Sequence, residues 1–592
     1  MGVTAVTLGS FYTTSAGKTV LGGAGGSGLD TQSLVTALTT AKQAPITQDQ
    51  SLIKTNDSKS TALTQLQTLL STFKSAADAL RNAPGVNNEA NNAFAFTTGD
   101  IGNGGSAYVS VTTSPRAALQ SYAISDVSSI ATAASQGSGT FSFASANADA
   151  TTGAVRFNPG TITFAGGATV TVNSGDSLNT ILANFNAVSS QTGISASIIQ
   201  VDSSHYAVSF IATSTGTNGS FDLGDAGTVT SGGSVLSNLS LGGAVAGTDA
   251  KFKINNVPVE RQTNNISDVI NNVTFKILGT SPNGIDYPVT VSPDTTTIQN
   301  TIVSFVNAYN AIKTFQTQQT QLNSDGTYAA DSVLVNDPTF QTIMSDINRN
   351  VNSQVAGLGA GALSSLSQIG VTFTNQPATS TTPEVDNILT VNDGQLASAL
   401  ASNFTGVRNL FGFNMTSSNP NFALYSHTLP LGVSDFTVAI DNNAQTYTAT
   451  YTQNNHSFTT QLTATPLTGG VPGFTLTGAP GSVLAGATFI YASNSSATFT
   501  AHATQGIADQ VFGTATTALT ANTGILPVAL KSLKDSDTKL NDDIAKINVQ
   551  VSAYQQQLIA KFAVLERAIS SSNTLLQSIN ANSNAQLASS GH

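Results

Sequence analysis

The sequence predicts a multidomain α+β protein, with a coiled-coil leg built from both ends of the chain and β-rich heads built from its middle. Near each end, apolar residues recur at alternating spacings of three and four residues, which is the seam of a coiled coil. Much of the middle alternates apolar and polar residues with a period of two, which is typical of half-buried strands. We expect the two ends to lie side by side while the middle projects as heads. Assembly subunits have this arrangement more often than enzymes do.

The two seams are the candidate contact surfaces of the chain. They consist of Leu63, Leu66, Leu70 and Phe73 near the start, and of Leu540, Ile544, Ile547, Val551, Tyr554, Leu558, Phe562 and Leu565 near the end. At Leu558 the C-terminal seam takes two successive steps of four residues, which is a stutter that locally unwinds a supercoil.

Composition narrows the class of protein. A chain of 592 residues predicts several domains, at about 100–200 residues each. Charged residues make up only 9%, against a usual share of about 25%. The net charge is −11 and no cluster of Lys and Arg is present, which argues against a nucleic-acid-binding protein.

The chain has no Cys, so it can occupy an oxidising compartment without mispaired disulfides. Residues 1–28 lack the basic and apolar regions of a cleaved secretory signal, and no stretch approaches the roughly 18 apolar residues of a membrane span. We therefore expect a secreted protein that is exported without a cleaved signal peptide.

The N-terminal part is predicted to hold a disordered segment and one arm of the leg. Residues 1–28 are rich in Gly, Ser and Thr and are expected to be disordered. The arm spans 29–82. Asp30 is expected to cap its helix, and Pro45 to break the helix or force a restart.

Two β-rich modules are expected next. Residues 83–137 and 248–292 form one β head domain, and 138–247 form an outer α+β head domain, with the boundary at the Gly/Ser-rich segment Gln136–Gly139. The outer domain has a ββαββ pattern, after which Gly224–Gly247 is predicted to be a low-complexity loop. The expected elements are strands Thr161–Phe164, Thr169–Val172, Ile194–Val201 and Tyr206–Ala212, with a helix over Asp176–Val188.

The C-terminal half returns to helices with one interruption. Residues 293–413 and 505–525 are predicted to form a helical domain, and 414–504 to form an all-β domain inserted into it. Residues 526–592 form the second arm of the leg, with Pro527 in the first turn of the helix.

No motif predicts catalysis, a metal or a cofactor. Gly23, Gly25 and Gly28 match a dinucleotide fingerprint, but no buried strand precedes them and a flexible linker is the better interpretation. The five histidines have no second ligand at metal spacing, and we interpret them as plain surface or strand residues. An enzyme acting on polysaccharides would need paired acidic residues in a cleft, and the β modules are poor in acids.

Several segments resemble the flagellar filament capping protein family, also called hook-associated protein 2. The resemblance covers most of the chain outside 414–504, and the segments occur in the family's order. They are Gly26–Thr31 with Leu34–Val35 and Ala44–Pro45, Gly247–Asn255 with Asn264–Ile270, Phe305–Asn310, Gly370–Phe373 and Leu410–Phe411, followed by the closing coiled coil.

The resemblance implies a structural protein at the distal tip of the bacterial flagellar filament. It implies a ring-like homo-oligomer, a pentamer, whose heads form a plate and whose legs insert between flagellin subunits. The seam residues would then contact other copies or flagellin, and the legs would stay partly unfolded until they meet matching flagellin helices. Hook–filament junction proteins and an export chaperone are the other implied partners.

The insertion at 414–504 departs from shorter relatives, in which the flanking segments lie close together. We expect an independent, outward-facing domain whose removal leaves capping intact. The alternative for the whole chain is a surface adhesin with β heads on a coiled-coil stalk, which would serve in cell adhesion.

Overall fold

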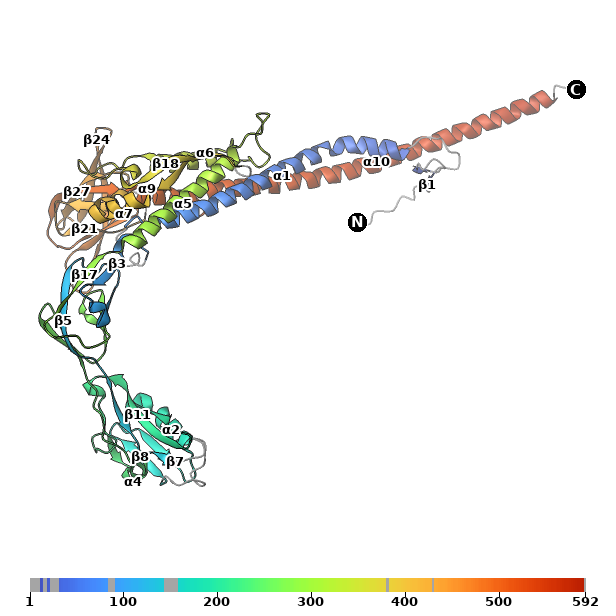
Figure 1. The fold of residues 1–592 in the computed structure, drawn as a ribbon. Coiled ribbons are helices and arrows are strands. Elements are labelled where there is room, and N and C mark those ends of the chain that lie inside the picture. The colour runs from blue at the N-terminus through green and yellow to red at the C-terminus, as the bar shows by residue number, and fades with distance from the viewer. Residues whose placement is uncertain are drawn as a thin grey trace. The chain divides into compact units, whose positions relative to one another are not determined.

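The computed structural model describes residues 11–13, 19–21, 31–82, 91–142, 158–379, 383–428 and 431–589. These residues form two units. The first, called the leg unit here, consists of Met1–Arg81, Ile302–Leu396 and Thr405–His592. The second, the head unit, consists of Asn82–Thr301 and Ala397–Phe404. The observed mixture of long helices and antiparallel sheets confirms the α+β multidomain class (Figure 1).

Within the segment expected to be disordered, two short strands are described. β1 (Phe11–Thr13) pairs in antiparallel fashion with β2 (Thr19–Leu21). The other residues of 1–28 lie outside the described part of the chain, so their expected disorder stays a prediction.

The arms of the leg are single long helices that run side by side (Figure 1). α1 covers Thr31–Asp78 and α10 covers Ile525–Ser589. Their direction is antiparallel, because Lys42 Nζ lies 5.0 Å from the ring centre of Tyr554 while Asn56 Nδ2 donates to Asp537 Oδ1 at 2.7 Å.

The expected break at Pro45 is wrong, because α1 continues through it without interruption. A proline inside a helix removes one backbone hydrogen bond and costs about 3 kcal/mol. Packing offsets this cost here, since α1 contacts α10 on both sides of Pro45, at Lys42 and at Asn56.

The C-terminal part of α1 is built into a helical core. The core comprises α5 (Thr295–Thr320), α6 (Pro338–Asn352), α7 (Asp393–Ser402), α8 (Phe404–Phe411), α9 (Ile507–Leu519) and the hairpin of β18 (Val371–Gln376) with β19 (Val385–Val391). The ring of Phe73 lies 4.9 Å from that of Phe305 and 6.1 Å from that of Tyr309. The ring of Phe305 in turn lies 5.9 Å from that of Phe411.

The segment Phe305–Asn310, one of the segments that carry the resemblance, therefore has a structural explanation. Phe305 and Tyr309 fill the space beside Phe73, and Asn310 secures the hairpin. The amide Nδ2 of Asn310 donates to the carbonyl of Leu389 at 2.8 Å, and its Oδ1 accepts from the N–H of Leu389 at 2.8 Å.

The head unit contains two modules, each with its own apolar core. The inner module has a five-stranded sheet in the order β14-β13-β5-β17-β3 and a three-stranded sheet in the order β15-β16-β4. Its strands are β3 (Thr97–Ile101), β4 (Val109–Thr113), β5 (Ser121–Ser129), β13 (Ala250–Ile254), β14 (Val257–Arg261), β15 (Asn265–Ile270), β16 (Val273–Ile277) and β17 (Asp286–Pro293).

The outer module confirms the expected ββαββ order. Helix α2 (Leu178–Ala187) begins after Ser177, whose hydroxyl accepts a hydrogen bond from the N–H of Thr180. One sheet has the order β12-β8-β9, and in the other β10-β11-β6 is joined by β7. The strands are β6 (Ala133–Gly137), β7 (Phe141–Ser142), β8 (Gly160–Phe164), β9 (Thr169–Val172), β10 (Ile194–Gln200), β11 (His205–Thr215) and β12 (Val229–Ser231).

Two expectations for this module are wrong. The boundary does not fall at 136–139, because β6 pairs with β11 and Ala134 is buried in the outer core. The stretch 224–247 is not a plain loop. It contains β12 and α4 (Gly233–Leu236), and it buries Val235, Leu236 and Leu239 in the outer core. Its few apolar side chains are sufficient to hold it against β8.

The inserted β domain occupies 413–505, one residue beyond each expected bound, and is called the insertion below. Its eight strands are all antiparallel, in the order β20-β27-β22-β23-β24-β25-β26-β21, and they enclose a separate apolar core. The strands are β20 (Phe413–Ser417), β21 (Phe422–His427), β22 (Asp435–Asp441), β23 (Thr446–Gln453), β24 (His456–Pro466), β25 (Phe474–Gly478), β26 (Ala487–Tyr491) and β27 (Ala497–Gln505). A search of the described helices finds none with the length and apolar character needed to cross a membrane.

We expect Asn310→Ala to loosen the β18–β19 hairpin, because both polar groups of Leu389 lose their partner. Leaving a buried backbone group unpaired costs about 1–3 kcal/mol. Hydrogen exchange should therefore accelerate at the Leu389 amide. Asn307→Ala, an exposed position on the same helix, is the control and should change nothing. Equal protection of Leu389 in both variants would contradict this role for Asn310.

Candidate functional site: the helical leg

The four predicted seam residues of the N-terminal arm are completely buried within the chain itself. Leu63, Leu66, Leu70 and Phe73 have no exposed surface, because α5 and α9 cover this part of α1. In this structure they hold the helical core together, and they are not accessible to another protein.

The C-terminal seam is only partly covered. Val551 and Leu558 are buried, while Leu540, Ile544, Ile547, Tyr554 and Phe562 are half-buried. Leu565 is 46% exposed, and the neighbouring Glu566 is buried in its place. A further step of four residues after Phe562 explains this difference, because it turns position 566 rather than 565 toward α1.

The free end of α10 extends beyond α1. From the contact of Lys42 with Tyr554, counting back along both helices places Thr31, the first residue of α1, near Leu565. No other described helix lies beside the last part of α10 (Figure 1). Leu575, Leu576 and Ile579 on this end are 53–62% exposed. They form an apolar stripe on a helix without a described partner.

Sequence reasoning missed the apolar residues that lie off the seam. Those with large exposed surfaces are Leu34, Leu38 and Leu52 on α1, and Val549, Val564 and Leu575 on α10. Such a residue can be recognised in the sequence because its position does not fit the alternating three- and four-residue spacing of the seam. These residues are spread along both helices, and exposed apolar residues that stand singly are common on soluble proteins.

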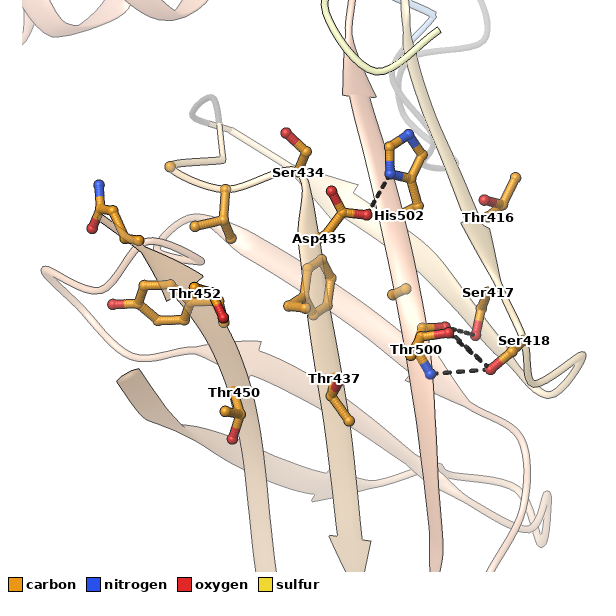
Figure 2. Close-up of a pocket in the computed structure, with 16 residues that line it drawn as sticks. Thr416, Ser417, Ser418, Ser434, Asp435, Thr437, Thr450, Thr452, Thr500 and His502 are labelled. Carbon is orange, nitrogen blue, oxygen red and sulfur yellow. Dashed lines mark hydrogen bonds and ion pairs between the residues drawn. The ribbon is translucent and has the colours of Figure 1, made fainter. Parts of the chain in front are cut away.

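A groove of about 790 Å³ lies on the insertion and is lined largely by hydroxyl side chains (Figure 2). Thr500, Thr437 and Thr450 lie opposite one another on three adjacent strands. Asp435 and His502 lie in its lining, together with the phenol of Tyr451.

The groove lacks the arrangement of a hydrolase. His502 Nδ1 lies 2.7 Å from Asp435 Oδ1, and its Nε2 lies 2.9 Å from the carbonyl oxygen of Gly357. Both ring nitrogens are therefore occupied, and neither is available to take a proton from a nucleophile. A glycosidase needs two carboxylates, and the lining of this groove contains a single carboxylate, that of Asp435. In the described part of the chain, no group of three or more His, Asp or Glu residues is arranged to hold a metal ion.

Comparison with known proteins places both arms of the leg in one family. The model of the flagellar hook-associated protein 2 N-terminus matches residues 27–134, and the model of the C-terminus matches residues 247–574. The unmatched interval between them contains most of the outer head module.

Individual relatives agree with this. The B-type flagellar hook-associated protein 2 of Pseudomonas aeruginosa is 26% identical over 281 residues, which are 43% of this chain and 56% of the relative. Flagellar hook-associated protein 2 of Escherichia coli O157:H7 is 27% identical over 404 residues, which are 64% of this chain and 78% of the relative. The crystal structure of the D1-D2-D3 domains of the flagellar cap protein FliD from Escherichia coli covers 59% of this chain and 89% of its own, with 23% identity and a TM-score of 0.40. The C-terminal model alone spans more than half of the sequence, and the chain belongs to the flagellar hook-associated protein 2 family.

Proposed function

We propose that this protein caps the distal end of the bacterial flagellar filament, promotes the polymerisation of flagellin beneath it and prevents the loss of exported flagellin. The observation that carries this proposal is the match of the N-terminal and C-terminal family models to the two arms that form one leg. The adhesin alternative has no support from the comparisons. The proposed role is structural, so the protein acts by contact and not by catalysis.

The free end of α10 is the surface that we assign to contact with flagellin. Its Leu575, Leu576 and Ile579 side chains are exposed, and most other residues of the segment are small and uncharged. Burial of apolar area contributes about 25 cal/mol per Å², so three such side chains supply a moderate driving force. Residues 568–589 contain no Asp, Glu, Lys or Arg, which suits contacts that must be broken and re-formed as each subunit is added.

The remaining partners follow from the same proposal. The cap is a ring-like homo-oligomer, a pentamer, that sits at the filament tip outside the cell. It is exported without a cleaved signal peptide, with the help of an export chaperone. It reaches the tip after the hook–filament junction proteins are in place.

Replacing Leu575, Leu576 and Ile579 together by Ser should stop filament growth without unfolding the protein. These side chains are exposed and belong to no apolar core in the described part of the chain. The assay is complementation of a strain lacking its own cap, with filament length measured by electron microscopy and flagellin measured in the medium. The matched control replaces the exposed polar residues Asn573, Gln577 and Asn580 by Ala. Normal filaments from both variants would exclude this surface as the flagellin contact.

Hydrogen exchange of the purified monomer should divide the leg into two parts. The amides of 566–589 should exchange fast, because an isolated helix without a partner is marginally stable in water. The amides of 63–78 should be protected, because this part of α1 is enclosed by its own core. This expectation replaces the view that both arms are unfolded before assembly. Fast exchange along all of α1 in a verified monomer would restore that view.

A further inference from the structure

We propose that the insertion is a clamp on the C-terminal end of leg helix α1, and not a detachable decoration. The inference does not depend on what the protein caps or binds. In this proposal, contacts from residues 413–505 fix the position of the C-terminal end of α1.

The central contact is a buried cluster of Arg81, His427 and Asp509, called the joint cluster below. Arg81 is the last residue of the first segment of the leg unit, His427 ends strand β21 of the insertion, and Asp509 lies in the first turn of α9. Their side chains are 3%, 0% and 1% exposed. Three distant parts of the chain therefore meet at one charged site inside the protein.

The hydrogen bonds of the joint cluster connect all three residues. Arg81 Nε donates to Asp509 Oδ1 at 3.1 Å, and Arg81 Nη2 donates to the main-chain oxygen of His427 at 2.9 Å. The Nε2 atom of His427 lies 2.7 Å from the same Asp509 oxygen and 2.9 Å from Arg81 Nη2, so the imidazole contacts both members of the ion pair. The insertion thus supplies a main-chain acceptor for Arg81 and an imidazole that contacts both Arg81 and Asp509.

Aromatic rings exclude water from this site. The ring centre of Phe512 lies 3.9 Å from the guanidinium carbon of Arg81, and the ring of Phe413 lies 4.2 Å from the imidazole of His427. In such surroundings a charge that loses its partner is strongly destabilising, because water cannot replace the partner. Arg81 is held by Asp509 and Phe512 of α9 and by Asp78 of α1, and the insertion adds His427 to this site.

The backbone at the base of the insertion makes the same connection. The N–H of Phe413 donates to the carbonyl of Arg81 at 2.7 Å, and the N–H of Gly506 donates to the carbonyl of Gly412 at 2.9 Å. A Cβ at position 506 would lie 2.3 Å from the carbonyl carbon of Phe411, so only glycine lets the two ends of the insertion approach this closely. The first strand of the insertion is thus tied directly to the end of α1.

A second, separate contact holds the insertion to the helical core. His502 on β27 contacts Asp435 on β22 (Figure 2). Its other ring nitrogen contacts the carbonyl of Gly357, which lies in the loop after α6. Both ring nitrogens face acceptors, so only the doubly protonated imidazolium makes both bonds. The hydrogen bond that His502 donates to Asp435, and then the one to the carbonyl of Gly357, raise the pKa of His502 above its ordinary value of 6.5. Thr416 on β20 and the hydroxyl of Thr504 also face the ring, and among these described neighbours Asp435 alone is charged.

The clamp is tested by hydrogen exchange on the full chain with substitutions at His427. In His427→Ala, amides of 70–78 and 507–519 should exchange about ten- to a hundredfold faster, since the buried Asp509 carboxylate loses a side-chain partner while its ion pair with Arg81 remains. His427→Gln should recover most of the protection, because its Nε2 can occupy the position of the imidazole Nε2. His456→Ala, an exposed histidine of the same domain, should leave exchange unchanged.

A second variant covers the case in which His427→Ala unfolds the insertion itself. Replacing 413–505 by a short Gly/Ser linker should accelerate exchange at 70–78, contrary to the expectation that the domain can be removed without consequence. Unchanged exchange at 70–78 in this deletion, or in a folded His427→Ala protein, would overturn the proposal. Filament growth is not the readout, so the result stands whether or not the protein caps filaments.

The contact between His502 and Asp435 makes the attachment of the insertion to the helical core depend on pH, and the raised pKa of His502 sets the direction of this dependence. Because the folded-state pKa is raised, the stabilisation is complete below about 6.5 and is lost as the pH rises through the higher folded value. The gap in thermal midpoint between the natural protein and His502→Gln should therefore be larger at pH 6 than at pH 9. Asp435→Asn should reduce this difference. The same gap at both pH values would show that the imidazolium bridge does not hold the insertion.

Discussion

The rest of the leg unit depends on the burial of one face of α1. Leu63, Leu66, Leu70 and Phe73 lose all contact with water, and each such side chain contributes about 1.5–3 kcal/mol when fully buried. The surfaces that cover them come from α5, α9 and α10, which are separated from α1 by hundreds of residues. The core therefore forms only when the start, the middle and the end of the chain have come together.

The same constraint divides the leg into two parts with different properties. The part near the helical core is rigid because three helices cover α1, whereas the free end of α10 has exposed leucines and no described partner. The covered part of α1 belongs to the apolar core of the leg unit, whereas the free end of α10 keeps its apolar side chains exposed.

The insertion shows how a domain can be added to such a core without disturbing it. Its ends meet at Gly412 and Gly506, so the helical domain continues from α8 to α9 almost as if the chain were uninterrupted. Its sheet has a core of its own, and its outer face carries hydroxyl groups that water solvates well. The joint cluster is the exception, because it places charged and polar side chains from two domains in a site closed to water.

The sequence by itself determined which elements form and which of their faces are apolar. The spacing of Leu63 to Phe73 predicted the buried face of α1, the alternation around 161–212 predicted the ββαββ module, and the change of period located the insertion to within one residue. Periodicity carries this information because it depends only on neighbours along one helix or strand.

What covers each face was decided only by the tertiary structure. The N-terminal seam is covered by its own chain and not by a partner, Pro45 is tolerated because α10 packs on both sides of it, and 224–247 is ordered because its few apolar residues reach a core. The joint cluster was invisible for the same reason. Arg81 and Asp509 are 428 positions apart, and nothing in the residues near either one indicates the other. Contacts over such distances are selected by the folded chain as a whole, where an unpaired buried charge is too costly to persist.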